Sequence, residues 1–531
     1  MKIIEKYFKN VVILLLIVIF VFLSFKKVNS SDTLIPNLEP YPDSLYYSIP
    51  AWNFVHGNGF SMKTQNIVIR QQTPPLYGIY LIPFFALSNN VRSFYYANMI
   101  LLIGTIIFFG LTIDKIFTGK KIYKGILIFF LGFFLVTNFY FYSIPQLLMA
   151  EPITIFLVTL GMYLYFSETS ISNTIIAGQI SFLLMMVKLS NLPYAAILST
   201  LFFIKFLPKK GLNKYLKLFL ISTIVGITYF LIYIFTSKLL FNHKNLGGTD
   251  FNFSHFKEGI KIYTRTLFGI EGIRYLWFAE RFASSIVVFV TLTGVMVGLL
   301  RTNYRKITFV LLFLIIFSVL FMSFFVTQDI RYIIAILPAY LIFMGFFIQE
   351  ISLKINDAFA IVIMLAIIIL SLFLNSQGNN NEISIITFKK QVGLNLRHRE
   401  VPWNYEAVEI FNKFTKNSDP KKTYIGTFLP PPFVEIYLNK QYQTLPISSW
   451  QEFYWLEPNL LKKIIGGDDV LARYQKLVKE GNNVYITHYY ENNVPSQWPK
   501  MINDLMLNFK VNRIYNGCLG ACDIYQLKIK E

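Results

Sequence analysis

Charged side chains are scarce in this chain. Only 15% of its 531 residues are charged and 54% are hydrophobic, whereas soluble domains carry about 25% charged residues. A water-soluble protein of this length needs more polar surface than this composition supplies. The apolar residues also gather in blocks of about 17–25 residues, the length that crosses a bilayer as a helix. The composition therefore argues against a soluble fold and predicts a polytopic α-helical membrane protein.

Cysteine is scarce too. Cys518 and Cys522 are the two cysteines, in the run CLGAC, and no histidine lies near them. This makes a zinc site weak, and a small disulfide loop in an oxidising compartment or two free thiols remain the interpretations. The C-terminal part lacks a nucleotide-binding glycine loop, and the chain lacks an internal repeat, which many transporters have.

Acidic residues are few as well. Lys and Arg number 49 against 29 Asp and Glu, so the net charge is +20. Such a balance can indicate nucleic-acid binding, but here many basic residues lie in short loops between apolar blocks, the positive-inside pattern of membrane proteins. The remaining cations suit anionic lipid or a phosphate-bearing substrate. We expect membrane lipid, and no nucleic acid, among the partners.

Eleven apolar blocks are long enough to span a membrane. They lie near residues 11–25, 93–113, 122–142, 148–167, 174–190, 191–207, 218–237, 284–300, 307–326, 332–349 and 357–375. A shorter block, Leu76–Leu87, contains Pro83 and is expected to be re-entrant or interfacial. No small-residue cleavage site follows the first block, so we expect a retained helix rather than a cleaved signal peptide.

The basic loops orient the chain. With a cytoplasmic N-terminus, loops 114–121, 208–217 and 301–306 lie inside and carry three, four and three basic residues. The long loops 26–92 and 238–283 then lie outside, as the positive-inside rule requires, and Lys26 and Lys27 are the exception to it. We therefore expect a multi-pass protein of the cell membrane.

The sequence changes character after the last apolar block. Short apolar segments at 423–428 and 483–488 alternate with helical patterns at 404–414 and 495–509. This alternation is typical of an α/β domain. We expect a transmembrane module over residues 1–375 and an extracytoplasmic α/β domain over residues 376–531.

Two acidic residues near the outer face are candidates for catalysis. Asp43 precedes a potentially helical stretch, Leu45–Val55, and Glu151 opens an apolar block in MAEPITIF. A helix N-cap explains Asp43, and the helix dipole with Pro152 in the first turn explains Glu151, without invoking any function. Two carboxylates at one membrane face nevertheless form a candidate site.

Basic residues accompany them. Lys188 lies where one apolar block ends and the next begins, Arg331 follows Asp329, and Arg70 lies in the first outer loop. Snorkelling explains Lys188 and a surface pair with Asp329 explains Arg331. Together these cations are suited to a lipid-linked phosphate. His56 is a weaker candidate, and the outer loop 238–283 is expected to be an interfacial amphipathic segment that covers the site or guides the acceptor.

These motifs, in this order, resemble a known class. The pattern D-x-x-Y-Y-x-x-x-A-x-N-x-x-x-G-x-G-F (43–60), then PPLY (74–77), MAEPITIF (149–156) and RYIIAILPAY (331–340), is similar to the GT-C membrane glycosyltransferases. That class includes the protein O-mannosyltransferases and the lipid A aminoarabinose transferase. The motifs cover about 60 residues, whereas the architecture is similar over the whole chain.

The resemblance implies a reaction. A hexosyl or pentosyl group would pass from a polyprenyl-phosphate donor to a lipid, glycan or protein acceptor outside the cytoplasm. Asp43 matches the catalytic base and Glu151 the second acidic position, which orients the acceptor or assists a cation. Lys188 and Arg331 would neutralise the donor phosphate. A divalent cation is a candidate cofactor that the sequence does not require.

The remaining candidates and departures concern the first outer loop. Tyr46, Tyr47, His56 and Arg70 complete the expected substrate-binding set. Several members of the class have lysine before the Pro-Pro pair, where this chain has Thr73. Ser44 follows Asp43, so the acidic pair of some members is absent too. The alternative hypothesis is a transporter or flippase of a lipid-linked envelope precursor, using the same cations to hold phosphate.

Overall fold

The chain forms two compact units in a computed structural model. The structure describes residues 2–29, 43–64, 67–69, 73–89, 93–207, 213–237, 253–268, 285–325, 330–377, 411–426, 442–445, 470–487, 497–516 and 523–530. The first unit, called the helical unit, comprises Met1–Ser30, Thr73–Tyr77 and Tyr95–Leu394. The second unit comprises Ser31–Gln72, Gly78–Phe94 and Asn395–Glu531.

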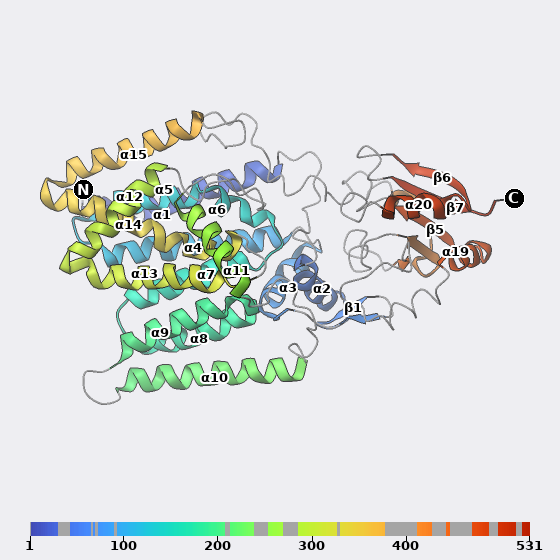
Figure 1. Cartoon of the computed structure of the whole chain (residues 1–531), viewed down its shortest axis with the longest axis horizontal. Helices are drawn as coiled ribbons and strands as arrows, with labels where there is room; N and C mark the ends of the chain where they lie inside the picture. The colour runs from blue at the N-terminus through green and yellow to red at the C-terminus, as the bar shows by residue number, and fades with distance from the viewer. Residues whose placement is uncertain are drawn as a thin grey trace. The chain divides into compact units, whose positions relative to one another are not determined.

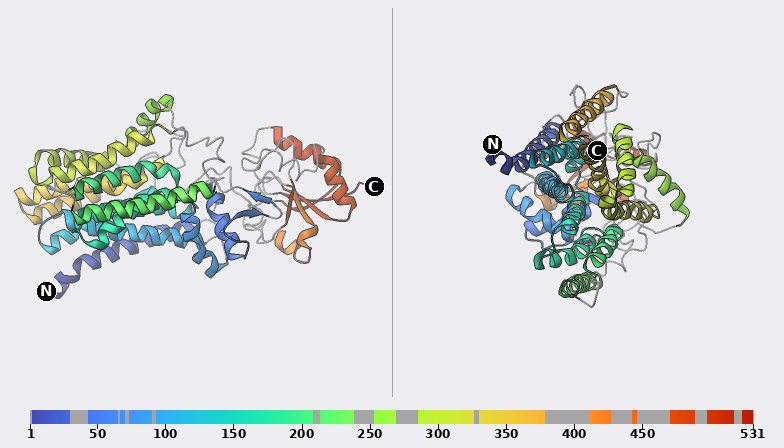
Figure 2. Two further views of the ribbon diagram at one scale, coloured as in Figure 1. Left: turned by 90° about the horizontal axis from the view of Figure 1, so that it is seen from below. Right: turned by 90° about the vertical axis from the view of Figure 1, so that its left-hand side faces the viewer.

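Long apolar helices running side by side make up most of the helical unit (Figures 1 and 2). They and shorter helices are α1 (Lys2–Asn29), α4 (Phe94–Ile116), α5 (Lys121–Val136), α6 (Phe139–Ser143), α7 (Glu151–Phe166), α8 (Ile171–Val187), α9 (Leu192–Phe206), α10 (Lys214–Ser237), α11 (Phe253–Leu267), α12 (Ser285–Leu300), α13 (Thr302–Met322), α14 (Leu337–Lys354) and α15 (Asp357–Gln377). Short 3-10 turns are η2 (Ile144–Gln146), η3 (Leu189–Asn191), η4 (Ile330–Tyr332) and η5 (Ile334–Ile336).

The helical unit has the lengths and composition of a membrane protein. Each of the eleven predicted apolar blocks contains a helix, and in the described ranges six helices are long and apolar enough to cross a membrane by themselves. The chain is therefore a mostly helical, multi-pass membrane protein. The number of spans, eleven, stays a prediction.

One predicted block was wrong in extent. Residues 122–142 were expected to form a single helix, but α5 ends at Val136 and α6 begins at Phe139. Between them, Asn138 caps α6, and its side-chain oxygen accepts hydrogen bonds from the backbone N–H groups of Tyr140 and Phe141 at 3.1 and 3.3 Å. An asparagine that satisfies the N–H groups of a new helix competes with continuing the old one. The chain thereby turns before it reaches Glu151.

Glycines bring the helices of this unit close together. A Cβ atom at Gly294 in α12 would collide with the carbonyl group of Phe343 in α14, and one at Gly178 in α8 would lie 2.7 Å from the Cβ of Ser222 in α10. Small residues at such crossings let helix backbones approach, which is how helices associate where lipid supplies no hydrophobic driving force. The two crossings thus fix α12 on α14 and α10 on α8.

The second unit contains short helices and two sheets. Its N-proximal part has α2 (Asp43–Val55), a hairpin of β1 (Met62–Thr64) and β2 (Ile67–Ile69), and most of α3 (Leu76–Ser88). The helix α3 has 13 residues, which is too short to span a bilayer. This length agrees with the expectation of a re-entrant or interfacial segment.

The described C-terminal residues include a five-stranded mixed sheet and two helices that pack on it. The strand order is β4 (Gln443–Leu445), β3 (Thr423–Gly426), β5 (Asn483–Thr487), β7 (Ile524–Lys528), β6 (Lys510–Tyr515); β3 pairs in parallel with β4 and β5, and β7 is antiparallel to β5 and β6. The helices α19 (Val470–Lys479) and α20 (Gln497–Met506) bury Tyr474, Leu477, Ile502 and Leu505 against it. The strands β3 and β5 lie within the predicted segments 423–428 and 483–488.

Candidate active site

Glu151 is the first residue of α7 and is 5% exposed. Pro152 follows it in the first turn, where a missing N–H costs nothing. The hydroxyl of Thr154 donates to the carbonyl oxygen of Ala150 at 3.0 Å, which ties the first turn together. A carboxylate at this end of the helix also lies at the positive end of the helix dipole. Both local sequence and electrostatics therefore favour an acidic residue at this position.

Lys188 lies where α8 breaks. Its backbone is extended, with φ −161° and ψ 135°, and the turn η3 follows before α9 begins at Leu192. This break directs the lysine to the start of α7, where its Nζ donates to Oε1 of Glu151 at 3.3 Å. The predicted position of Lys188 between two helices is thus correct, and its side chain turns inward rather than snorkelling.

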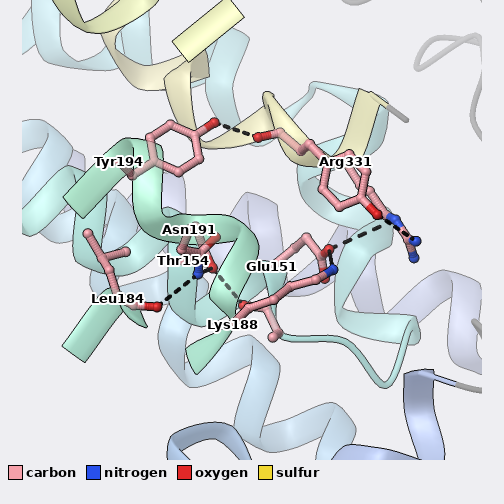
Figure 3. A network of polar contacts seen from close by, with 9 residues as sticks. Glu151, Thr154, Leu184, Lys188, Asn191, Tyr194 and Arg331 are labelled. Atoms are coloured by element: carbon pink, nitrogen blue, oxygen red, sulfur yellow. Dashed lines mark hydrogen bonds and ion pairs between the residues drawn. The ribbon is translucent and has the colours of Figure 1, made fainter. Parts of the chain in front are cut away.

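Arg331 joins the same carboxylate. It belongs to η4, just before α14, is 8% exposed, and its Nε lies 4.0 Å from Oε1 of Glu151. Figure 3 shows Glu151 between the two cations. Residues that are 37 and 180 positions away from Glu151 in the chain therefore meet at one point of the helical unit.

Tyr332 lies beside both cations. The Nζ of Lys188 is 4.8 Å from the centre of its ring, and the guanidinium carbon of Arg331 is 5.2 Å from it. Arg331 Nη2 also reaches the Tyr332 hydroxyl at 3.4 Å. Cation–π contacts strengthen when they are removed from water, so this buried ring helps to fix the positions of the two positive charges.

A second layer of hydrogen bonds supports the group (Figure 3). The Tyr194 hydroxyl donates to the carbonyl oxygen of Tyr332 at 2.5 Å. The side-chain amide of Asn191 donates to the hydroxyl of Thr154 at 2.9 Å and to the carbonyl oxygen of Leu184 at 3.3 Å. These bonds connect the turn η3 with the start of α7 and the end of α8, and the start of α9 with the segment before α14. We call Glu151, Lys188, Arg331 and Tyr332, with this layer, the Glu151 cluster.

The Glu151 cluster is suited to holding an anion. Ionised side chains within membrane helices are costly and mark functional sites by default. Two cations that are already oriented by a carboxylate and a ring present several N–H donors for phosphate oxygens, and arginine does so in a forked geometry. In the described ranges no group of three or more His, Cys, Asp or Glu side chains lies close enough together to hold a metal ion.

The structure places the other predicted residues in the second unit or leaves them undescribed. Asp43 is the first residue of α2, but its side chain lies outside the described atoms, and Arg70, Asp329, Cys518 and Cys522 lie outside the described residues.

The described candidates of the first outer loop lie in α2 or directly after it. Tyr46 and Tyr47 are buried in that helix. His56 follows it, with Nδ1 2.8 Å from the carbonyl oxygen of Trp52 and its ring 4.2 Å from the Trp52 ring. Both contacts are local, so they fix the histidine against its own helix.

Sequence reasoning missed Tyr332, Asn191 and Tyr194. Tyr332 is adjacent to Arg331 within the element RYIIAILPAY, and Asn191 comes three residues after Lys188. Their proximity to predicted cations was the available signal. None of the three residue types implies a partner by itself, because the contacts of Asn191 with Thr154, of Tyr194 with Tyr332 and of Tyr332 with Lys188 join different elements.

The outer loop 238–283 was expected to be an interfacial amphipathic segment. The described helix of that loop, α11, spans Phe253–Leu267, and residues 269–284 lie outside the described ranges. Its buried residues repeat with helical period, so the described part of the loop is an amphipathic helix.

No protein-family model matches the sequence, and comparison with curated proteins gives no match. Solved structures are similar in fold. ArnT from Cupriavidus metallidurans bound to undecaprenyl phosphate has a TM-score of 0.60 and 11% identity, and the match covers 97% of this chain and 97% of that one. The arabinofuranosyltransferase AftD from mycobacteria has a TM-score of 0.54 and 10% identity over 98% of this chain and 40% of that one. Both are GT-C glycosyltransferases.

The chain therefore has the GT-C membrane-protein fold, and the resemblance that its motifs predicted is confirmed at this level.

Proposed function

We propose that this chain is a glycosyltransferase that moves a hexosyl or pentosyl group from a polyprenyl-phosphate donor to an extracytoplasmic acceptor. The GT-C fold supports the reaction class, and the related ArnT structure contains undecaprenyl phosphate. The observation that carries the proposal is the buried Glu151 cluster, in which two cations meet at one end of the membrane helices. Phosphate is the ligand that this chemistry fits best.

In this proposal Lys188 and Arg331 bind the donor phosphate. The phosphate gains negative charge as the bond to the sugar breaks, so cations that are fixed in advance stabilise the transition state more than the ground state. Glu151 contacts both cations. This contact favours a role for Glu151 in orienting the cations over a role in binding the acceptor. Tyr332 keeps the cations at a constant separation.

Asp43 is the proposed general base. Its carboxylate would take the proton of the acceptor hydroxyl while that oxygen attacks the sugar carbon and the phosphate leaves, so direct displacement inverts the configuration. Arg70 and His56, from the same outer loop, are proposed to contact the substrate. Tyr46 and Tyr47 are buried in α2, and we propose that they position this loop for the substrate.

The proposed topology places this chemistry outside the cytoplasm. Eleven spans with a cytoplasmic N-terminus put the start of α7, the end of α8 and the segment before α14 at the outer face, together with loop 26–92 and residues 376–531. A polyprenyl-phosphate sugar presented in the outer leaflet then reaches the cluster without leaving the membrane.

Transfer of radiolabelled sugar tests the proposal. Purified protein is offered a panel of polyprenyl-phosphate monosaccharides with a membrane extract as acceptor, and Asp43→Asn is assayed in parallel, with Asp419→Asn in the second unit as control. Turnover that Asp43→Asn abolishes and Asp419→Asn preserves supports donor class and base together. Movement of intact donor across vesicles without any glycosidic product would instead favour the transporter hypothesis.

A further inference from the structure

The helix α11 has two different sides. Facing the other helices are the buried residues Gly259, Ile262, Tyr263, Thr266 and Leu267. Their spacing of three and four residues puts them on one side of a helix. A helix of this length with one apolar side is not a membrane span, because 15 residues rise only about 22 Å. Such a helix is suited to packing on a surface with its apolar side.

Aromatic contacts and a hydrogen bond place α11 at one end of the helical unit. The Phe256 ring stacks on Phe324 at 4.5 Å, and the Phe253 ring meets Phe324 edge-on at 5.0 Å. Phe324 comes just after α13 ends at Met322. At the other end of α11, the hydroxyl of Tyr340 donates to the carbonyl oxygen of Leu267 at 2.9 Å.

This end is the one that holds the Glu151 cluster. Tyr340 lies in the first turn of α14, and Arg331 lies in the segment that leads into the same helix. Figure 1 shows α11 crossing the long helices near this end rather than running along them. A short amphipathic helix that crosses the ends of membrane helices lies at the height of the lipid headgroups.

The outward side of α11 carries a stripe of positive charge. Lys257 and Lys261 are exposed and Arg265 is half-buried, and the three follow one another at intervals of four residues. This interval places them in a row on one helix face. Glu258 is the acidic residue of the same helix, so the face has three cations to one anion.

We propose that Lys257, Lys261 and Arg265 form a binding surface for anionic phospholipid headgroups of the leaflet that surrounds the Glu151 end of the helical unit. The apolar side of α11 is packed on the helix ends, so the cationic row faces the headgroup layer. Phe253, at the N-terminal end of the helix, is 78% exposed and adds an apolar group of the kind found on interfacial amphipathic helices. Basic residues near such a surface attract anionic lipid cumulatively.

Native mass spectrometry of bound lipid tests this surface. The purified full chain in detergent is mixed with equal amounts of phosphatidylglycerol and phosphatidylcholine, and the lipids retained on the folded protein are counted. We expect the wild type to prefer phosphatidylglycerol. In the triple variant K257Q/K261Q/R265Q, the ratio of bound phosphatidylglycerol to bound phosphatidylcholine should fall about tenfold. Glu258→Gln, on the same helix, should keep or increase it.

Two controls keep the test decisive. The variant K476Q/K479Q removes charge from α19 in the second unit and should bind phosphatidylglycerol as the wild type does. An unchanged preference in the triple variant, or an equal loss in K476Q/K479Q, would overturn the proposal. If the triple variant does not yield folded protein, Lys257→Gln and Lys261→Gln are measured singly, each with an expected loss of two- to threefold, and no loss in either would again overturn it. Sugar transfer is not measured, so the result does not depend on the proposed activity.

Discussion

Among the described residues of the helical unit, three charged clusters have the same balance of charges and different surroundings. Each contains one carboxylate and two cations. They are Glu151 with Lys188 and Arg331, Asp114 with Lys9 and Lys124, and Glu350 with Arg301 and Lys354. The first is at the start of α7. The other two lie at the opposite end of the helices. Glu350 is near the C-terminal end of α14. Asp114 is near the C-terminal end of α4, and the ring of Phe117, just beyond that helix, lies 5.4 Å from the ring of Phe346 in α14.

Burial separates the clusters. The side chains of Glu151, Lys188 and Arg331 are 7%, 14% and 8% exposed. In the Asp114 cluster the carboxylate is 25% exposed, and Lys9 and Lys124 are 33% and 21% exposed. Ion pairs in contact with water contribute little to the free energy of folding. The pairs of the Asp114 cluster join neighbouring helices. A buried group carries a desolvation penalty that stability alone does not justify, and this difference supports the proposed functional role of the Glu151 cluster.

The largest effect is expected when a cation of the Glu151 cluster is removed. Lys188→Gln and Arg331→Gln should each lower kcat/KM for sugar transfer by roughly 100-fold or more, because the leaving phosphate loses a fixed positive partner. The measurement is steady-state transfer with purified protein whose folding is checked by gel filtration. Lys354→Gln, from a cluster of the same composition, is the matched control. Equal losses in Lys188→Gln and Lys354→Gln would remove the distinction between the two ends.

Neutralising the carboxylate should have a smaller effect on transfer and a clear one on stability. Glu151→Gln leaves two buried cations without their common anion, which costs about 3–5 kcal/mol when a buried pair is broken. We expect a lower Tm and a transfer rate reduced about tenfold, since both cations remain but are less well oriented. The double variant Glu151→Gln/Lys188→Gln should be no less stable than Glu151→Gln alone, because coupled partners are not additive. Additive losses of Tm would contradict the proposed coupling.

The order of the helices and part of this cluster could be predicted from the sequence. Apolar length and loop charge placed a helix start at Glu151 and a helix junction at Lys188, and the motif around Arg331 added the second cation. These are local signals, and each depends on a few neighbouring residues. The contacts among them depend on how α7, α8 and the segment before α14 pack, which these local signals do not specify.

The supporting residues could not be predicted, because their roles depend on distant partners. Asn191 is an ordinary helix-junction residue until α7 brings Thr154 within 2.9 Å of it. Asp114 was counted only as part of a basic loop, because its partner Lys9 lies 105 positions away. The break at Asn138 was missed for another reason: one side chain that caps a helix overrides an apolar run long enough to span.

A still smaller effect is expected in the hydrogen-bonded layer. Asn191→Ala removes the donor to Thr154 and to Leu184, and a buried bond of this kind contributes about 1 kcal/mol. The Tm should fall modestly and transfer should decrease several-fold, because the start of α7 is held less firmly. Thermal unfolding followed by tryptophan fluorescence, with transfer assays below the transition, checks both. Asn191→Asp, which keeps the size but not the amide donor, should resemble Asn191→Ala; wild-type behaviour would mean that the bond positions nothing.

The smallest effect is expected at the Asp114 cluster. Lys9→Gln and Lys124→Gln remove single partners of Asp114 from partly exposed pairs at 2.7 and 2.6 Å, and pairs of this kind contribute at most about 1 kcal/mol. Transfer should stay within about twofold of the wild type, while the loss of Tm should shrink as salt is added, because exposed charges are screened and buried ones are not. The same titration on Lys188→Gln should leave its loss of Tm nearly unchanged. A similar salt response at both clusters would mean that the Glu151 cluster is hydrated, and burial would then no longer support the proposal that one set of three charges is functional while another joins helices.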